Sequence, residues 1–307
     1  MIRKGGVTLR RTIGAIMLLL GVLLIGQAVA DSAVGDWLLA SPSPSSSIPI
    51  SDIDRVFITS GSGEVRIHVE DRQDLAVSMQ GPGADRAALR LDRRGSELRI
   101  RAARPWWTWP PWSDQAVLEV RLPGAFDGAL GTQVRSGALV ISGPPVGGTS
   151  LRALELELRS GWVELTDLAA GALSLTVRSG QLSAEGVTAG EARLHQASGA
   201  VRLDRFSGPL EAQLSSGNLS VDFASLPGPV RVDQSSGRLL LDLPAGAGFE
   251  LDVRVRSGSF ESDLPAAPST GDVRSGMVAT YGGGGPRVQI RANSGSVSLR
   301  SHAPVER

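Results

Sequence analysis

The sequence contains no cysteine in its 307 residues, which excludes disulfide bonds, thiolate metal sites, a cysteine nucleophile and a lipid-modified cysteine anchor. Histidine occurs only as His68, His195 and His302, in no spacing typical of a zinc site and beside no evident nucleophile. Basic and acidic residues balance at 31 each, so the excess of positive charge typical of a nucleic-acid binder is missing. We therefore expect no cofactor and no nucleic-acid partner.

Aromatic residues are also scarce, at 4% of the chain, whereas glycine occurs 38 times. This balance is typical of β architecture with many turns. Beyond the amino terminus, no segment combines sustained helical periodicity with capping signals. The expected fold class is therefore all-β.

The one long apolar run extends from Ile13 to Ala30, contains no charge and follows four basic residues. This pattern is typical of a hydrophobic export helix and predicts that the rest of the chain is extracytoplasmic, in the bacterial cell envelope or secreted. Residues 1–30 are a signal peptide, cleaved before Asp31, or a signal anchor that holds the protein on the membrane. Residues 31–50 are predicted as a Ser/Pro-rich linker, whose spacer character slightly favours the anchor.

Ser-Gly pairs recur at a near-constant spacing. They begin at Ser136, Ser160, Ser179, Ser198, Ser216, Ser236 and Ser257, separated by 24, 19, 19, 18, 20 and 21 residues. Apolar residues alternate with polar ones on both sides of each pair, which predicts two short strands per repeat, each with one buried face. The glycine supplies the turn, and we expect the serine to bond to neighbouring backbone or to the serine of the next repeat.

A repeat of about 19 residues is too short for a strand-plus-helix unit. We therefore predict a single-stranded parallel β-helix, or β-solenoid, over residues 131–302, with rungs of about 19 residues. An antiparallel sandwich of short strands is the alternative. Similar patterns at Ser62-Gly63 and Ser294-Gly295 are interpreted as caps of the stack, with residues 51–130 as an amino-terminal β cap region.

The repeated RSG and SSG corners, the export segment and the terminal block GGGGPRVQIRANSGSVSLR together resemble a bacterial family of adhesin-like β-strand repeats of unknown function. The resemblance covers about residues 50–300. It implies a β-solenoid displayed at the cell envelope, and it brings no catalytic residues with it.

Four tryptophans lie within seven positions of a proline-rich segment, at Trp106, Trp107, Trp109 and Trp112. Prolines keep this segment out of a sheet, and so short a loop cannot bury every indole. Exposed tryptophan favours a surface glycan, an envelope protein or the membrane headgroup region as the partner. The alternative is a hydrophobic cap over an open end of the solenoid.

Five acidic residues stand six positions after successive corner serines, namely Glu185, Asp204, Asp222, Asp242 and Asp263. In the predicted register they form a column whose oxygen ligands suit Ca²⁺. A structural role is the stronger interpretation, because acidic residues commonly end strands and the dense Asp/Gly motif of calcium-binding repeats is missing. A second outward row, Glu155, Ser174, Arg193, Glu211, Arg231 and Asp252, predicts a ladder of ion pairs across rungs.

Together these patterns favour a non-enzymatic, exported cell-envelope module with an adhesin-like binding or structural role. One alternative is an accessory protein of an envelope-stress sensing pathway, which would need another membrane protein as its partner. The other is a carbohydrate-active enzyme on a β-helix, in which Asp204, Asp222 and Arg205 form an acid/base cluster.

Overall fold

The computed structural model describes residues 45–61, 63–81, 84, 88–103, 116–144 and 150–302. The predicted export segment lies outside these residues, and among the described ones no helix is both long and apolar enough to cross a membrane. Residues Pro44–Arg307 form one compact unit. The all-β prediction is confirmed for the described chain, which is built from strands β1 to β25.

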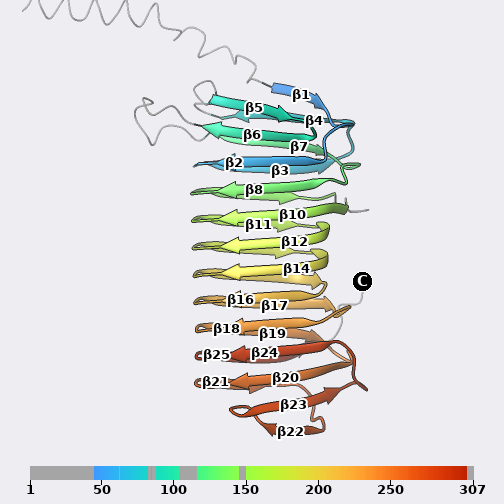
Figure 1. Cartoon of the computed structure of the whole chain (residues 1–307), viewed down its shortest axis with the longest axis vertical. Coiled ribbons are helices and arrows are strands. Elements are labelled where there is room, and N and C mark those ends of the chain that lie inside the picture. Colours follow the sequence, from blue (N-terminus) through green and yellow to red (C-terminus); the bar gives the residue numbers. More distant parts are fainter. Residues whose placement is uncertain are drawn as a thin grey trace, which may run out of the picture. The chain divides into compact units, whose positions relative to one another are not determined.

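The strands form two ladders that enclose one hydrophobic core (Figure 1). The first ladder consists, in spatial order, of β5 (Ala88–Arg94), β6 (Glu97–Ala103), β2 (Arg55–Ser60), β8 (Ala129–Val134), β10 (Ser150–Leu158), β12 (Ala169–Val177), β14 (Thr188–Gln196), β16 (Leu210–Leu214), β18 (Val230–Gln234), β24 (Arg287–Ala292), β20 (Phe249–Val255), β23 (Gly276–Tyr281) and β22 (Ser269–Asp272). The second consists of β1 (Ser45–Pro49), β4 (Asp74–Gln80), β7 (Val117–Pro123), β3 (Glu64–Glu70), β9 (Ala138–Ser142), β11 (Trp162–Thr166), β13 (Gln181–Glu185), β15 (Ala200–Ser207), β17 (Asn218–Ser225), β19 (Arg238–Pro244), β25 (Ser296–His302) and β21 (Ser259–Ser262).

From β8 to β19 each rung pairs in parallel with the rung before it, in the register that the Ser-Gly repeat predicts. Leu156 pairs with Leu175, which pairs with Leu194, and all three side chains are buried. Strands of this part alternate buried and exposed residues, as in β16 and β18. Apolar side chains at the same position of successive rungs therefore stack on one another in the core, and the packing repeats from rung to rung.

The two segments interpreted as caps are instead interior rungs. Strands β2 and β3 lie between β6–β7 on one side and β8–β9 on the other, paired in parallel with both. Strands β24 and β25 likewise lie between β18–β19 and β20–β21. The Ser-Gly pattern specifies a rung but not its place in the stack, so sequence order misplaces both.

Antiparallel strands occupy the two ends. β1 and β4 pair antiparallel beyond β7, and β5 pairs antiparallel with β6. At the other end β23 pairs antiparallel with β20, and β22 with β23. We call β1, β4 and β5 the amino-terminal cap and β22 with β23 the carboxy-terminal cap. These strands cover the last parallel rungs, whose backbone and core would otherwise be exposed.

Glycines hold the corner between the two ladders. They stack in the spatial order Gly63, Gly137, Gly161, Gly180, Gly199, Gly217, Gly237, Gly295 and Gly258. Each carbonyl except that of Gly258, the last of the stack, accepts a hydrogen bond of 2.9–3.0 Å from the amide just after the next glycine. Gly161 has φ +110°, and a Cβ there would collide with the backbone of Gly137. Only glycine therefore fits this corner.

The corner serines contribute less than expected. Ser198 and Ser236 donate their hydroxyl groups to backbone carbonyls of the preceding rung, at 2.9 and 3.1 Å. Among the described corner serines none bonds to another corner serine. The backbone ladder of the glycines, rather than a serine ladder, joins the rungs here.

Candidate functional site

The four tryptophans of the predicted binding loop lie in the segment 104–115, outside the described residues. The flanking strands β6 and β7 make the parallel rung next to β2 and β3. Recognition by this loop stays a prediction.

The acidic column is present in part on the outer face of the second ladder. Glu185 pairs in register with Asp204, and Asp222 with Asp242. The next residue of the column is Arg300, which pairs with Asp242 because β25 lies between β19 and β21. Asp263 follows on the far side, where it accepts a hydrogen bond of 2.9 Å from the amide of Ser301. An arginine therefore interrupts the row of carboxylates.

Arginines also neutralise the column from the side. Arg202 donates to Asp204 at 2.6 Å, and this hydrogen bond, with the charges of Asp204, Asp222 and Asp242, raises the pKa of the Arg202 guanidinium. Among the described residues no group of three or more His, Cys, Asp or Glu side chains is arranged to hold a metal ion. The arrangement favours an ion-paired face over a calcium site, so Ca²⁺ binding stays a prediction without added support.

Arg205 of the predicted acid/base cluster pairs with two other carboxylates, and the cluster stays a prediction. The Arg205 guanidinium donates to Glu185 at 2.9 Å and lies 4.0 Å from Asp167, at the second corner of the rung. Asp167 and Arg205 both have positive φ, and between them stands Gly186, whose space their side chains border. Asp167, Gly186 and Arg205 thus lie together on successive rungs at this corner. His195 lies on β14 in the first ladder and His68 on β3, so neither histidine joins this group.

The outward row of the first ladder follows the predicted register from Glu155 to Arg231. Arg193 lies 3.9 Å from Glu211, an ion pair across rungs. Gln289 then stands between Arg231 and Asp252, again because the last rung of the chain is interior. Exposed pairs of this kind contribute little free energy, so the row chiefly supports register and solubility.

One group of exposed residues was not predicted from the sequence, although the repeated arginine before the corner serine could have indicated it. Arg135, Arg159 and Arg178 precede the corner serines of three consecutive rungs, and Trp162 follows the middle corner. Trp162 is 42% exposed, an unusual state for so large a ring. Its exposure depends on the residues beside it on the neighbouring rungs, which a linear pattern does not reveal. We call the three arginines the corner arginine column.

The fold and surfaces define a β-solenoid with ion-paired faces and a glycine-lined corner. Residues 53–300 match the Toastrack family (DUF4097), and the chain belongs to that family. The crystal structure of a candidate adhesin from Bacteroides fragilis NCTC 9343 is similar over 86% of this chain and 98% of that one, with a TM-score of 0.51 and 12% identity. At this identity the likeness concerns the fold alone.

A candidate lipid-binding protein from Parabacteroides distasonis ATCC 8503 aligns over 85% of this chain and 95% of its own, with a TM-score of 0.42 and 14% identity. That value is too low to add support. No curated protein matches the chain.

Proposed function

We propose that this protein is a non-enzymatic β-solenoid of the bacterial cell envelope, exported by its amino-terminal segment, whose role is adhesin-like binding. The segment 1–30 directs export and, if it is not cleaved, anchors the protein to the membrane. The partner is a polymer or protein of the cell surface. Membership of the Toastrack family and the likeness in fold to the Bacteroides fragilis candidate adhesin support this proposal.

The observation that carries the proposal is the unbroken backbone ladder of the nine corner glycines. Because each amide is bonded to the next rung, the corner is a rigid edge, and side chains beside it recur at a spacing of about 4.8 Å. A rigid, periodic edge suits the display of binding groups toward an extended partner better than it suits closure around a small substrate.

Export is tested on the full chain, because the absence of cysteine allows single-cysteine labelling without background. Ser183→Cys places a thiol on an exposed position of β13, and Thr8→Cys places one before the apolar run. A membrane-impermeant maleimide is expected to label the first variant in intact cells and the second only after lysis. The size of the labelled Ser183→Cys product reports whether residues 1–30 are removed. Labelling of Ser183→Cys only after lysis contradicts export.

A further inference from the structure

The corner arginine column is a straight row held by the backbone. The amide of Arg159 donates to the carbonyl of Val134 at 3.0 Å, and the amide of Arg178 donates to that of Leu158 at 2.9 Å. Arg135 is bonded in the same way to Ser60, on the rung before. Three guanidinium groups therefore leave one edge of the solenoid at successive steps of about 4.8 Å.

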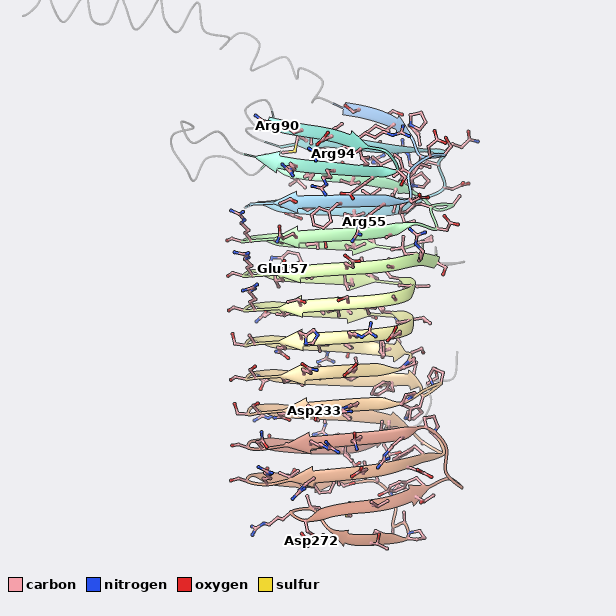
Figure 2. All side chains as sticks on the ribbon, viewed as in Figure 1. Arg55, Arg90, Arg94, Glu157, Asp233 and Asp272 are labelled. Carbon is pink, nitrogen blue, oxygen red and sulfur yellow. The ribbon has the colours of Figure 1, made fainter. Side chains whose placement is uncertain are left out.

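The column carries more positive charge than the residues around it balance. Glu157, labelled in Figure 2 toward the corner end of β10, lies 3.6 Å from Arg159 and 3.5 Å from Arg178. Arg135 makes no ion pair within the described residues. Arg159 and Arg178 thus share one anion, while their side chains stay 50% and 62% exposed. Shared pairing orients the two guanidinium groups without neutralising them.

Arginine holds this position on three consecutive rungs. Further along the corner the same position is held by Ala197, Ser215, Ser235 and Asn293, which carry no charge, and then by a single Arg256 on the β20–β21 rung. The column is therefore a local feature within a chain of balanced charge.

Trp162 adds a flat apolar surface on the other side of the same corner, because Arg159 follows a strand of the first ladder and Trp162 begins a strand of the second. In the ladder its neighbours are Ala138 and Gln181, which leave the indole 42% exposed. The exposed Ser160 lies between Arg159 and Trp162 in the sequence, and Ser136 and Ser179 hold the same corner position on the neighbouring rungs. A corner with guanidinium groups on one side and an aromatic ring on the other suits an extended sugar polymer that carries carboxylates: a sugar ring stacks on the indole, and a carboxylate accepts two hydrogen bonds from arginine.

We infer that the corner arginine column binds an extended acidic polysaccharide, of the class built from uronic acids, with the polymer lying along the stack of rungs. This inference deepens the proposed function, since such a polymer is met outside the cytoplasm, and the partner it names is a carboxylated glycan. Nucleic acid fits less well, because basic and acidic residues balance at 31 each over the whole chain.

The test is isothermal titration of residues 44–307, a compact unit with its own core, with a long oligogalacturonate. The probe is compared with its methyl ester, which lacks the charges, with poly-glutamate and with oligo(dT). We expect the charged glycan to bind and its methyl ester to bind at least tenfold more weakly, because the carboxylates supply the ion pairs. No binding of oligogalacturonate at low salt overturns the inference. Tighter binding of poly-glutamate or oligo(dT) also overturns it.

Variants locate the site. Arg135→Gln/Arg159→Gln/Arg178→Gln is expected to weaken binding about 30-fold, and Trp162→Thr about tenfold, whereas Trp162→Tyr retains most affinity because a stacking ring remains. The charge-matched control Arg90→Gln/Arg101→Gln/Arg254→Gln changes three exposed arginines elsewhere and is expected to alter affinity by less than about twofold. An equal loss in the control shows non-specific charge attraction and overturns the site. Because binding is measured on the isolated unit, a failure here is independent of the labelling test for export.

Discussion

The middle of the solenoid and its two ends use the same rung but different chain paths. From β8 to β19 each rung stacks on the one that precedes it in sequence. At the ends this order changes. The first rung of the chain, β2–β3, lies between β6–β7 and β8–β9. The last rung, β24–β25, lies between β18–β19 and β20–β21. The middle is thus stabilised by neighbours in sequence, and the ends by contacts between distant segments.

The difference separates two tasks. Regular stacking in the middle generates columns of identical positions, including the corner arginine column. The ends terminate the stack, and there antiparallel strands replace parallel ones. We expect substitutions in the middle to act locally and on binding, and removal of an inserted rung to affect a whole end.

The largest expected effect follows from deleting the inserted rung. Truncation of residues 287–307 removes β24 and β25 and leaves β20 and β21 without their parallel partner strands, so we expect loss of the cooperative unfolding transition of the carboxy-terminal half. Urea unfolding followed by circular dichroism, with limited proteolysis, measures it.

The matched control replaces residues 245–286 with a copy of 226–229, the segment that joins β17 to β18. This shortcut joins β19 directly to β24, which already pairs with β18, and we expect a folded protein that has lost only the β20–β21 rung and the carboxy-terminal cap. If the shortcut unfolds and the truncation stays folded, the inserted position of β24–β25 is wrong.

A second prediction concerns corner glycines in the middle and a loop glycine near the end. Gly180 has φ +114°, and a Cβ there would strike the backbone of Gly161, so Gly180→Ala is expected to lower the free energy of unfolding by about 3 kcal/mol. Gly246 has φ +77° with nothing near its Cβ position, and Gly246→Ala is expected to cost only about 1 kcal/mol. Urea unfolding of both variants measures the difference. Equal losses would show that stacking adds nothing to the backbone strain.

Two buried glutamines sharpen the same contrast. Gln196, in the middle, donates to the carbonyl of Gly199 at 2.9 Å and leaves only its side-chain oxygen unpartnered, whereas neither amide atom of Gln234, which pairs with Ala292 of the inserted rung, has a hydrogen-bond partner among the described residues. Because an unpartnered buried amide is costly, Gln234→Leu is expected to raise the free energy of unfolding by about 1 kcal/mol. Gln196→Leu is expected to give no gain. Stabilisation by both variants, seen in urea unfolding, would contradict this account of the corner.

The smallest effect is a pH dependence at the carboxy-terminal end. Burial raises the pKa of the Asp252 carboxyl, but hydrogen bonds from Gln289 at 2.9 Å and Arg287 at 2.5 Å, with the arginine charge, lower it below its ordinary value. A lowered folded pKa stabilises the protein above the ordinary value of 3.8, and this contribution is lost as the pH falls through the folded value. Asp252→Asn is therefore expected to cost at most about 1 kcal/mol at neutral pH and nothing in acid. A cost that persists in acid would assign it to packing.

Much of the fold follows from local pattern. Strands, their buried faces and the glycine corner are readable because alternation and turn chemistry act within a few residues. The place of the end rungs is not readable, since a Ser-Gly rung fits any slot of the stack. The same cause explains why Arg300 interrupts the predicted acidic column and why Gln289 separates Arg231 from Asp252. The exposure of Trp162 depends on Ala138 and Gln181, its neighbours on other rungs.

The central claim is that the middle rungs bind the partner and the ends cover the stack. The tryptophan side chains can test this claim. Residues 44–307 contain Trp162 in the middle and the four tryptophans of the segment between β6 and β7. The direct measurement is the set of indole N–H resonances in a ¹⁵N spectrum, assigned by single Trp→Phe variants and followed during titration with oligogalacturonate. Movement of the Trp162 signal alone is the predicted result. Movement of the Trp106, Trp107, Trp109 or Trp112 signals with Trp162 unchanged would contradict the claim and place recognition on the loop.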